Sequence, residues 1–414
     1  MPDIRSTVTS GIAFLTKQKK SFKVNIPRAA ANNFLYRLTQ QYQPIYITSL
    51  GASPLQLGVV SGIGSAAAAG IAVPTGYLVD KYGPKKLFTI ATSTMAMASL
   101  LLAFSNDWLM TIPALILAAL ALRFSNTACG TVCGSSLKNE DRAVGMQLCD
   151  SLTAVPSFIG PLIAAFMIDV SGGLNATGIR SVYYFAFVGY CVLLPYVLKV
   201  FSDPSERPTG KAIPSFMEGI GEVLHEGRSV KRWILISALT ETSRVISLIF
   251  WPLYAVKIKL ADVLVLGTMG TAQIVFPLLL AIPMGRLADK YGRKRLLYAI
   301  TPGYCLAIVL FVVARSPVEL IVSSTLQGFL QLALVTKQAL TVELVPTRLI
   351  GRWLGILGLF VGLIGLFAPV IGGVIWDALS PDFLFIFIIM VELVKIPILA
   401  TVMERTPQQQ VRLS

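Results

Sequence analysis

The chain has 414 residues, of which 55% are hydrophobic and only 14% are charged, and its formal net charge is +14. Soluble globular domains are about one quarter charged, so this composition excludes an ordinary water-soluble protein. A strongly basic chain can bind nucleic acid, but the placement of its Lys and Arg residues favours a different explanation, given below. All five cysteines fall in apolar segments, so a disulfide-stabilised secreted domain is also excluded.

Twelve stretches are long and apolar enough to cross a hydrocarbon layer about 30 Å thick, which takes about 20 residues each. In chain order they are 29–50, 55–79, 87–105, 108–136, 143–169, 180–199, 232–256, 262–286, 295–314, 317–343, 349–377 and 382–402. We therefore predict an all-α membrane protein with twelve transmembrane helices in two six-helix, pseudo-symmetric halves. Its expected parts are an N-terminal arm at 1–28, a bundle at 29–199, a linker at 200–231, a second bundle at 232–403 and a tail at 404–414.

An internal repeat supports the division into halves. The heptapeptide at 80–86, DKYGPKK, returns at 289–295 as DKYGRKR, 209 residues further along the chain. Pro44 and Pro252 correspond at an offset of 208 residues, and so do Asp169 and Asp377. Duplicated six-helix halves are typical of transporters, because a cavity between two related bundles can open to either side in turn.

The Lys and Arg residues divide unequally between the loops of the two sides. The side that holds both termini carries 26 of them, the opposite side carries 4, and 5 lie within the apolar segments. Basic residues mark the cytoplasmic side of a membrane protein, so we expect a multi-pass plasma-membrane protein with both termini in the cytoplasm. The arm at 1–28 lacks the apolar core of a cleaved signal peptide, and we expect it to lie on the membrane surface. Asn175 begins a glycosylation sequon on the predicted outer side, and we interpret it as a chance occurrence.

Residues 76–87 (GYLVDKYGPKKL) and 285–297 (GRLADKYGRKRLL) resemble the loop signature of the major facilitator superfamily. The resemblance extends over about residues 29–402 and implies a secondary transporter in which these loops gate the cytoplasmic side. A carboxylate here can accept hydrogen bonds from a helix N-terminus of the other half, helix 11 or helix 5 in the family's arrangement. The alternative is a simple charged turn, and Pro84 departs from the family pattern. The expected gating residues are Gly76, Asp80, Lys81, Gly83, Gly285, Asp289, Lys290, Gly292 and Arg293.

Small residues form a stripe along the eleventh segment at helical spacing. A weaker stripe runs along the second segment. Such faces let helices approach closely, either as fixed packing or as an interface that slides. The two stripes consist of Gly351, Gly355, Gly358, Gly362, Gly365, Pro369 and Gly372, and of Gly58, Gly62, Ser65, Ala69, Ala72 and Gly76.

Ionisable residues inside the apolar segments are the main candidates for function. Each costs about 2.5–3.5 kcal/mol at the centre of a spanning helix unless it meets a partner or a wet cavity. Glu392 and Lys395 are three residues apart and can neutralise each other, so we interpret them as a structural pair. The remaining six lie on segments 1, 4, 5, 7 and 10, and the resemblance implies that segments 1, 4, 7 and 10 line a central cavity. They are Arg37, Arg123, Asp150, Glu241, Arg244 and Lys337.

A polar stripe on the first segment, which includes Arg37, predicts a wet helix face. Arg244 occupies nearly the equivalent place in the second half. Together with Arg123, these guanidinium groups suit a carboxylate or phosphate held by bidentate hydrogen bonds. The alternative is that Glu241 pairs with Arg244 and reduces the positive charge left for a substrate. The expected substrate-binding residues are Arg37, Gln40, Gln41, Arg123, Asn126, Glu241, Arg244 and Lys337.

A proton carrier in this chain must be a carboxylate, because the single histidine, His225, lies in the linker. Asp150 and Glu241 are the candidates, since burial raises the proton affinity of a carboxylate. For Asp150 the alternative is a salt bridge to Arg123 or Lys337. Arg123 also resembles the fourth-helix arginine of the superfamily's proton-antiporter branch, although the glycine-rich continuation is only partly matched.

Enzyme motifs are missing: the sequence has no phosphate-binding loop, nucleophile elbow or H-E-x-x-H pair. We therefore expect neither an enzyme nor a cofactor. Cys129 and Cys133 lie one helical turn apart, and we favour helix packing over a metal pair.

Three hypotheses remain open. The leading one is a proton- or ion-coupled transporter of a small organic anion, because basic residues outnumber acidic ones in the expected cavity. The alternatives are a proton-antiport drug or metabolite exporter, and a sensor that keeps the fold without transport. The expected partners are a small-molecule substrate, a coupling proton or ion and the lipid bilayer, but not nucleic acid, and the expected state is a monomer.

The charge asymmetry predicts which side each loop faces. In a background without native cysteines, Ser205→Cys and Lys290→Cys should react with an impermeant maleimide only from the cytoplasmic side, and Asn175→Cys only from outside. Labelling of the first two positions from opposite faces would contradict the arrangement of twelve spans.

Overall fold

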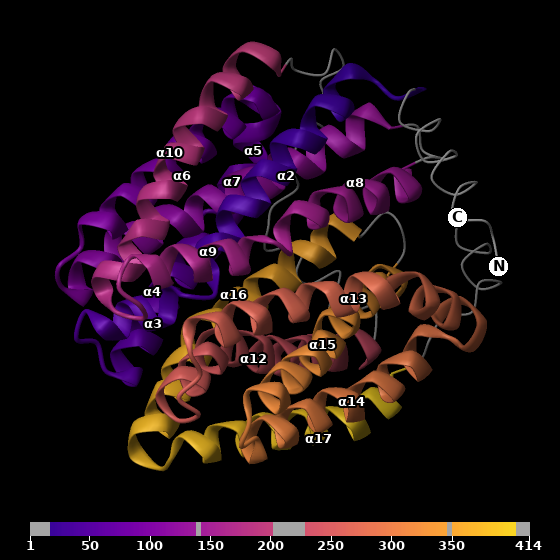
Figure 1. Ribbon diagram of the computed structural model, residues 1–414. Coiled ribbons are helices and arrows are strands. Elements are labelled where there is room, and N and C mark those ends of the chain that lie inside the picture. Colours follow the sequence, from indigo (N-terminus) through magenta and orange to yellow (C-terminus); the bar gives the residue numbers. More distant parts are fainter. Residues whose placement is uncertain (1–16, 138–141, 202–227, 346–349, 403–414) are drawn as a thin grey trace.

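The structure is a computed structural model that describes residues 17–137, 142–201, 228–345 and 350–402. Within these ranges the regular secondary structure is helical throughout. Helices α2 to α10 form one bundle and α12 to α17 form a second bundle beside it (Figure 1). The bundles correspond to the two halves expected from the repeat.

Several predicted segments of the first half are broken into two shorter helices. Segments one, two and five each consist of two helices, and Pro44 and Pro161 each stand at the second position of the helix that follows a break. Proline is tolerated there because the first turn of a helix leaves its N–H groups without intrahelical partners. The helices are α2 (Lys20–Gln40), α3 (Gln43–Ser49), α4 (Pro54–Gly70), α5 (Ala72–Tyr82), α6 (Pro84–Phe104), η1 (Trp108–Met110), α7 (Thr111–Ser136), α8 (Arg142–Ser157), α9 (Gly160–Val170) and α10 (Ala176–Val200).

The second half has one continuous helix for each predicted segment. Pro252, the counterpart of Pro44, lies inside an unbroken helix. The helices are α12 (Arg228–Lys257), α13 (Val263–Tyr291), α14 (Arg293–Val313), α15 (Pro317–Glu343), α16 (Ile350–Ala378) and α17 (Pro381–Ala400). The predicted linker between the halves falls mostly outside the described residues.

By length and composition, ten helical stretches in the described part of the chain can cross a bilayer, and one of them, Ser151–Val170, runs from α8 into α9. The pair α4 and α5, bent by 52°, makes eleven if it is counted as one span. α2 is not among them because polar and basic side chains lower its mean hydropathy, although its 21 residues rise about 31 Å. The count of twelve spans therefore stays a prediction.

The first helix begins earlier than the expected boundary between arm and bundle. α2 starts at Lys20, and Asn25 and Arg28 are buried in the bundle. The hydroxyl groups of Ser21 and Ser136 lie 2.8 Å apart, which joins the start of α2 to the end of α7. Residues 20–28 are therefore part of the bundle and not of a surface arm. The helix begins before the expected boundary because three polar side chains of this stretch, those of Ser21, Asn25 and Arg28, have partners inside the protein.

The two repeated loops have the same backbone conformation. Gly83 has φ +83° between α5 and α6, and Gly292 has φ +93° between α13 and α14. A side chain is strained at such angles, which explains glycine at both positions. Pro84 takes the first position of α6, as Arg293 does in α14. A proline at that position costs no intrahelical hydrogen bond, so the departure at Pro84 leaves the turn unchanged.

The halves touch closely at one end of the bundle, where α4 begins and α16 ends; we call it the closed end. A methyl group added at Gly58 would lie 2.2 Å from the carbonyl oxygen of Pro369, and one at Gly373 would lie 2.6 Å from Cα of Leu55. The backbone N–H of Leu55 also donates to a carboxylate oxygen of Asp377 at 3.1 Å. Backbones pack directly against each other here because side chains are absent.

A second contact between the halves joins α9 to α13 at the closed end. A methyl group at Gly267 would lie 2.7 Å from Cβ of Ala165. Nearby, the hydroxyl of Thr271 on α13 donates to the carbonyl oxygen of Phe158 at 2.7 Å. Two helix pairs thus shut the same end of the interface.

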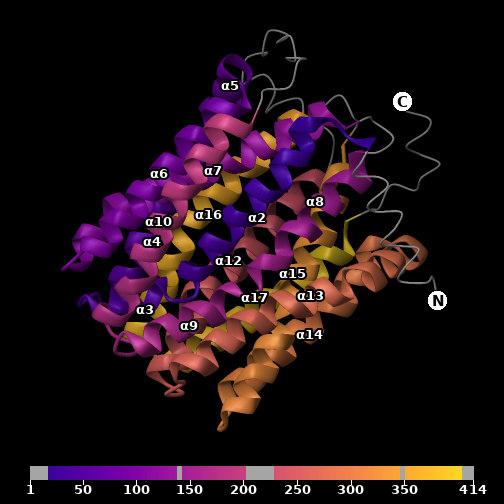
Figure 2. The same ribbon diagram turned by 45° about the horizontal axis from the view of Figure 1, so that its top comes forward.

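The halves separate toward the other end of the bundle, which carries the two repeats; we call it the repeat end (Figure 2). Along α16, Gly362 lies against Ala69 of α4, whereas no described atom from another element lies within 4 Å of a methyl group built at Gly358 or Gly355. Gly76 and Gly285 are equally open. Asp80 is exposed and makes no hydrogen bond or ion pair within the described ranges. The side chain of Asp289 lies outside the described part.

Substitution at Gly58 tests the closed end. Gly58→Ala should force α4 and α16 apart and destabilise the protein by about 1–3 kcal/mol through overpacking, which thermal unfolding in detergent measures. Gly70→Ala is the matched control, since a methyl group there has no described neighbour within 4 Å. It should be neutral or slightly stabilising, because alanine favours a helix by about 1 kcal/mol over glycine. Equal effects of both substitutions would contradict the contact.

Candidate functional site

Two neighbouring cavities lie between the halves. The smaller has a volume of about 170 Å³ and the larger about 460 Å³. Gln40, Arg244 and Leu248 line both of them, so these side chains form a partition. The partition combines residues of α2 and α12, the first helices of the two halves.

The smaller cavity is lined mainly by polar side chains. Arg37 reaches it from α2 and Gln41 from the residue that follows this helix, and α13 and α15 contribute three more glutamines. Two buried amide atoms of this lining, Nε2 of Gln41 and Oε1 of Gln327, have no hydrogen-bond partner within the described structure. Buried polar atoms are nearly always paired in folded proteins, so a donor and an acceptor are available to a bound molecule. The three glutamines are Gln273, Gln327 and Gln331.

The larger cavity is more apolar and belongs mostly to the first half. Its polar side includes Arg123 and Asn126 of α7 with Ser61 and Ser65 of α4. The Nε–H group of Arg123 donates to the backbone carbonyl of Ala68 at 3.3 Å, which fixes the guanidinium beside the bend between α4 and α5. The remaining donors of this guanidinium have no described partner.

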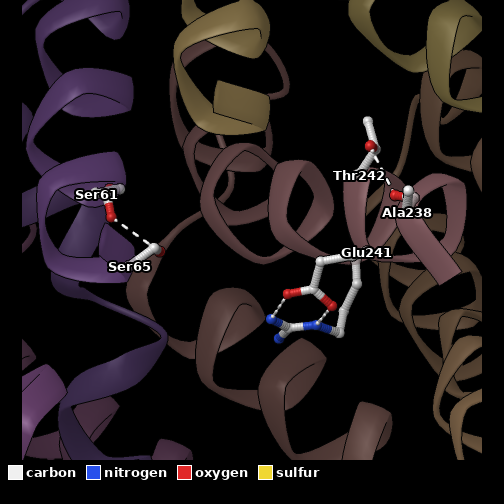
Figure 3. Close-up of polar contacts among 6 residues, drawn as sticks. Ser61, Ser65, Ala238, Glu241 and Thr242 are labelled. Carbon is white, nitrogen blue, oxygen red and sulfur yellow. Dashed lines mark hydrogen bonds and ion pairs between the residues drawn. The ribbon is translucent and has the colours of Figure 1, made fainter. Parts of the chain in front are cut away.

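Arg244 is held by Glu241, one turn earlier on α12. Its Nε and a terminal nitrogen donate to the two carboxylate oxygens at 2.8 and 2.5 Å, a bidentate ion pair (Figure 3). The side chain of Glu241 is 10% exposed and that of Arg244 is 34% exposed. The ion pair between Glu241 and Arg244, which was the alternative in the sequence-based prediction, is therefore present. It neutralises one of the three arginines.

Arg37 and Arg123 keep their positive charge. Arg37 donates to the amide oxygen of Gln40 at 2.8 Å, which orients the guanidinium without neutralising it. Among the described residues no carboxylate pairs with either arginine. The described linings also contain no Asp, Glu, His or Cys. The cavities thus offer two unneutralised guanidinium groups, several amides and no described metal ligand.

Six of the eight expected substrate-binding residues line these cavities: Arg37, Gln40, Gln41, Arg123, Asn126 and Arg244. Glu241 stands behind Arg244 and does not line either cavity. Lys337 is buried in α15 and lines neither cavity. The side chain of Asp150 lies outside the described residues, so its role in proton transfer stays a prediction.

Glu392 and Lys395 form the expected ion pair on α17, and both are buried. Tyr304 lies near Glu392, and its hydroxyl is 2.6 Å from that of Ser247, which lines the smaller cavity. The pair is therefore behind the cavity wall, which agrees with a structural role. Asn175 also has a structural explanation, since its side chain caps α10 by accepting from the N–H of Gly178 at 2.8 Å.

The glutamines of α13 and α15, together with Trp251 and Tyr36, line the cavities but were not predicted. A ranking of intramembrane residues by charge passes over neutral amides. A usable signal existed, because Gln327 and Gln331 are one helical turn apart within the predicted membrane-spanning segment at 317–343. Amides at that spacing predict a polar helix face as charged residues do.

Residues 30–258 and 233–413 match the family profile described as Major Facilitator Superfamily. An MFS-type transporter of Methanocaldococcus jannaschii is 27% identical over 355 residues, which cover 83% of this chain and 85% of the relative. A Mycobacterium tuberculosis protein is 30% identical over 131 residues, or 31% of this chain and 32% of that protein.

Two crystal structures of the nucleoside transporter NupG have the same fold, each with a TM-score of 0.77. They cover 93% and 94% of this chain and 100% of the matched chains, at 13% and 11% identity. At such low identity the likeness concerns the fold alone.

The two ion pairs should differ in their effect on stability. Glu392→Gln leaves the buried ammonium of Lys395 unpaired and should destabilise the protein by about 3–5 kcal/mol. Glu241→Gln should cost about 1 kcal/mol or less, since Arg244 borders a cavity and is partly exposed. Thermal unfolding of both variants in detergent measures the difference. A larger loss for Glu241→Gln would show that the cavity pair, and not the α17 pair, holds the fold.

Proposed function

Because the chain belongs to the major facilitator superfamily, we propose that it is a secondary active transporter that moves a small organic solute carrying an anionic group. The family resemblance and the all-α membrane fold inferred from the sequence are thereby confirmed. The anionic group is inferred from the positions of Arg37 and Arg123. Both border the cavities, and neither has a described carboxylate partner. A carboxylate or phosphate suits such planar, multi-donor groups.

The glutamine side chains of the smaller cavity indicate which other groups the substrate carries. Gln40, Gln41, Gln273, Gln327 and Gln331 present both donors and acceptors to the smaller cavity. A solute with several hydrogen-bonding groups beside its anionic group fits this lining better than a purely apolar acid. NupG transports nucleosides, which are also rich in such groups, but the likeness to NupG does not extend the substrate to this chain. An exporter of lipophilic cations fits poorly with a net positive cavity.

The transport cycle follows from the two ends of the interface. The closed end is shut by α4 with α16 and by α9 with α13, whereas the repeat end is apart. If the basic loops mark the cytoplasm, this is a cytoplasm-facing state. Closing the repeat end brings the two repeats toward helix N-termini of the opposite half, as expected for gating through Asp80 and Asp289. The glycine stripe of α16 permits this movement, because part of it already faces open space.

Glu241 is the candidate for the group that binds a coupling proton. Protonation of this carboxylate would break its bidentate pair with Arg244 and release a third guanidinium at the partition between the cavities. Proton binding would thereby favour anion binding, which is the requirement for cotransport. We place the protein in the plasma membrane as a monomer with both termini in the cytoplasm.

The substrate proposal is tested by exchanging guanidinium for ammonium. Arg37→Lys and Arg123→Lys keep the charge but lose the planar fork, so each should weaken binding of an anionic substrate by about 1–3 kcal/mol. The measurement is counterflow of a labelled metabolite panel in proteoliposomes, followed by affinity determination for the transported compound. Arg315→Lys, on an exposed loop, is the matched control and should leave affinity unchanged.

Thermal stability of the cavity variants should fall less than affinity, since a side chain at a wet cavity has little packing to lose. Normal transport by both Arg37→Lys and Arg123→Lys, or a panel in which only cations are transported, would overturn the anionic substrate.

A further inference from the structure

Three cysteines meet beside the first helix, away from both cavities. Cys129 and Cys133 lie one turn apart on α7 and therefore share a helix face. Cys149 joins them from α8, and the three sulfur atoms all lie within 4.8 Å of one another. Cys133 and Cys149 are buried and Cys129 is half-buried. No disulfide links any of the five cysteines.

The distances are close to those of a metal–thiolate centre. A zinc–sulfur bond measures about 2.3 Å, so three sulfurs around one zinc ion lie about 4 Å apart. Sulfurs within 4.8 Å therefore need only small side-chain adjustments to meet a common ion. Thiolates select soft or borderline metals such as zinc and cadmium over calcium or magnesium.

A basic side chain accompanies the thiols. Arg28 is 2% exposed, its Nε donates to the amide oxygen of Asn25 at 2.9 Å, and its guanidinium lies 3.7 Å from the ring centroid of Phe88. The amide nitrogen of Asn25 in turn donates to the sulfur of Cys129 at 3.3 Å. Within the described structure no carboxylate pairs with Arg28. A buried cation thus stands where thiolates would supply its counter-charge.

The charges favour a divalent ion. When three thiols bind a divalent metal, each ionised thiol releases one proton, and the centre carries a net charge of −1. The guanidinium of Arg28 neutralises this charge, whereas a monovalent ion would leave a buried excess of negative charge. We propose that Cys129, Cys133 and Cys149 form a binding site for a thiophilic divalent cation of the zinc and cadmium type, with Arg28 as its counter-charge.

Such a site would tie helices of one half together. It links α7 to α8, with α2 in contact through Asn25, and Cys133 lies three residues before the end of α7. All three helices belong to the first half, so the metal would stiffen that half near the repeat end without crossing the interface between halves. Transport itself would not require the ion.

The experiment uses the full-length protein, purified in detergent, reduced and stripped of metal. Titration with Cd²⁺ alone should produce a saturable thiolate-to-metal charge-transfer band with one equivalent bound, and Zn²⁺ should compete for it. Cys129→Ser, Cys133→Ser and Cys149→Ser should each abolish the band or weaken binding at least tenfold. Cys191→Ser and Cys305→Ser are the matched controls and should keep it, because neither belongs to the cluster.

Arg28 is tested separately because it acts through the thiolates. Arg28→Gln should weaken Cd²⁺ binding by about 10–100-fold, as for other residues beside metal ligands, and Arg28→Lys should restore most of the affinity. Thermal unfolding without metal controls for loss of structure. Absence of one-equivalent Cd²⁺ binding in the folded protein, or equal binding after all three cysteines are replaced, would overturn the site.

Discussion

The contact between α4 and α16 at the closed end is the constraint on which the rest of the interface depends. Gly58 and Gly373 let the backbone of one half touch the backbone of the other, which side chains would prevent. Because the halves meet there and separate toward the repeat end, space remains between them behind the contact. The cavities and the polar groups that line them occupy this space. The positions of a few glycines thus determine where polar side chains can be solvated inside the bundle.

Charged side chains in the interior of the protein are stabilised in three different ways. Glu392 and Lys395 neutralise each other inside one helix, at a place without access to the cavities. Arg37 and Arg123 instead border the cavities, where water or a solute can solvate them. Arg28 is buried among the amide of Asn25, the hydroxyl of Ser125 and the ring of Phe88, and Asn25 connects it to the thiol of Cys129. The first route serves the fold, whereas the other two leave charge that a ligand can use.

The sequence was sufficient for features that follow from composition and repetition. The segment boundaries agree with the helices to within a few residues for most of the chain. Both repeats contain a glycine at the same place because the backbone there has a positive φ, at Gly83 and at Gly292. The intramembrane arginines were found because charge in an apolar segment is conspicuous.

Features that depend on partners distant in sequence were not predictable in this way. Arg28 was assigned to a surface arm because a polar stretch looks the same whether or not it is enclosed by other helices. Cys149 could not be joined to Cys129 and Cys133, since nothing in the local sequence places α8 against α7. Lys337 was expected at the cavity because its helix was known, but the level at which the cavity ends along α15 was not: Lys337 lies one turn beyond Leu334, the last residue of α15 that lines the smaller cavity.

The breaks in the helices give the repeat an unequal mechanical meaning. Pro44 stands in the first turn of a new helix, whereas its counterpart Pro252 lies inside a continuous one, and α4 bends into α5 where α13 runs unbroken. A break between two helices lets the chain change direction by altering a few backbone angles. The first half therefore has breaks that the described part of the second half lacks, whereas the second half carries prolines inside its continuous helices, among them Pro277 and Pro283. The two related bundles thus bend at different places, and Arg37 lies directly before one of the breaks.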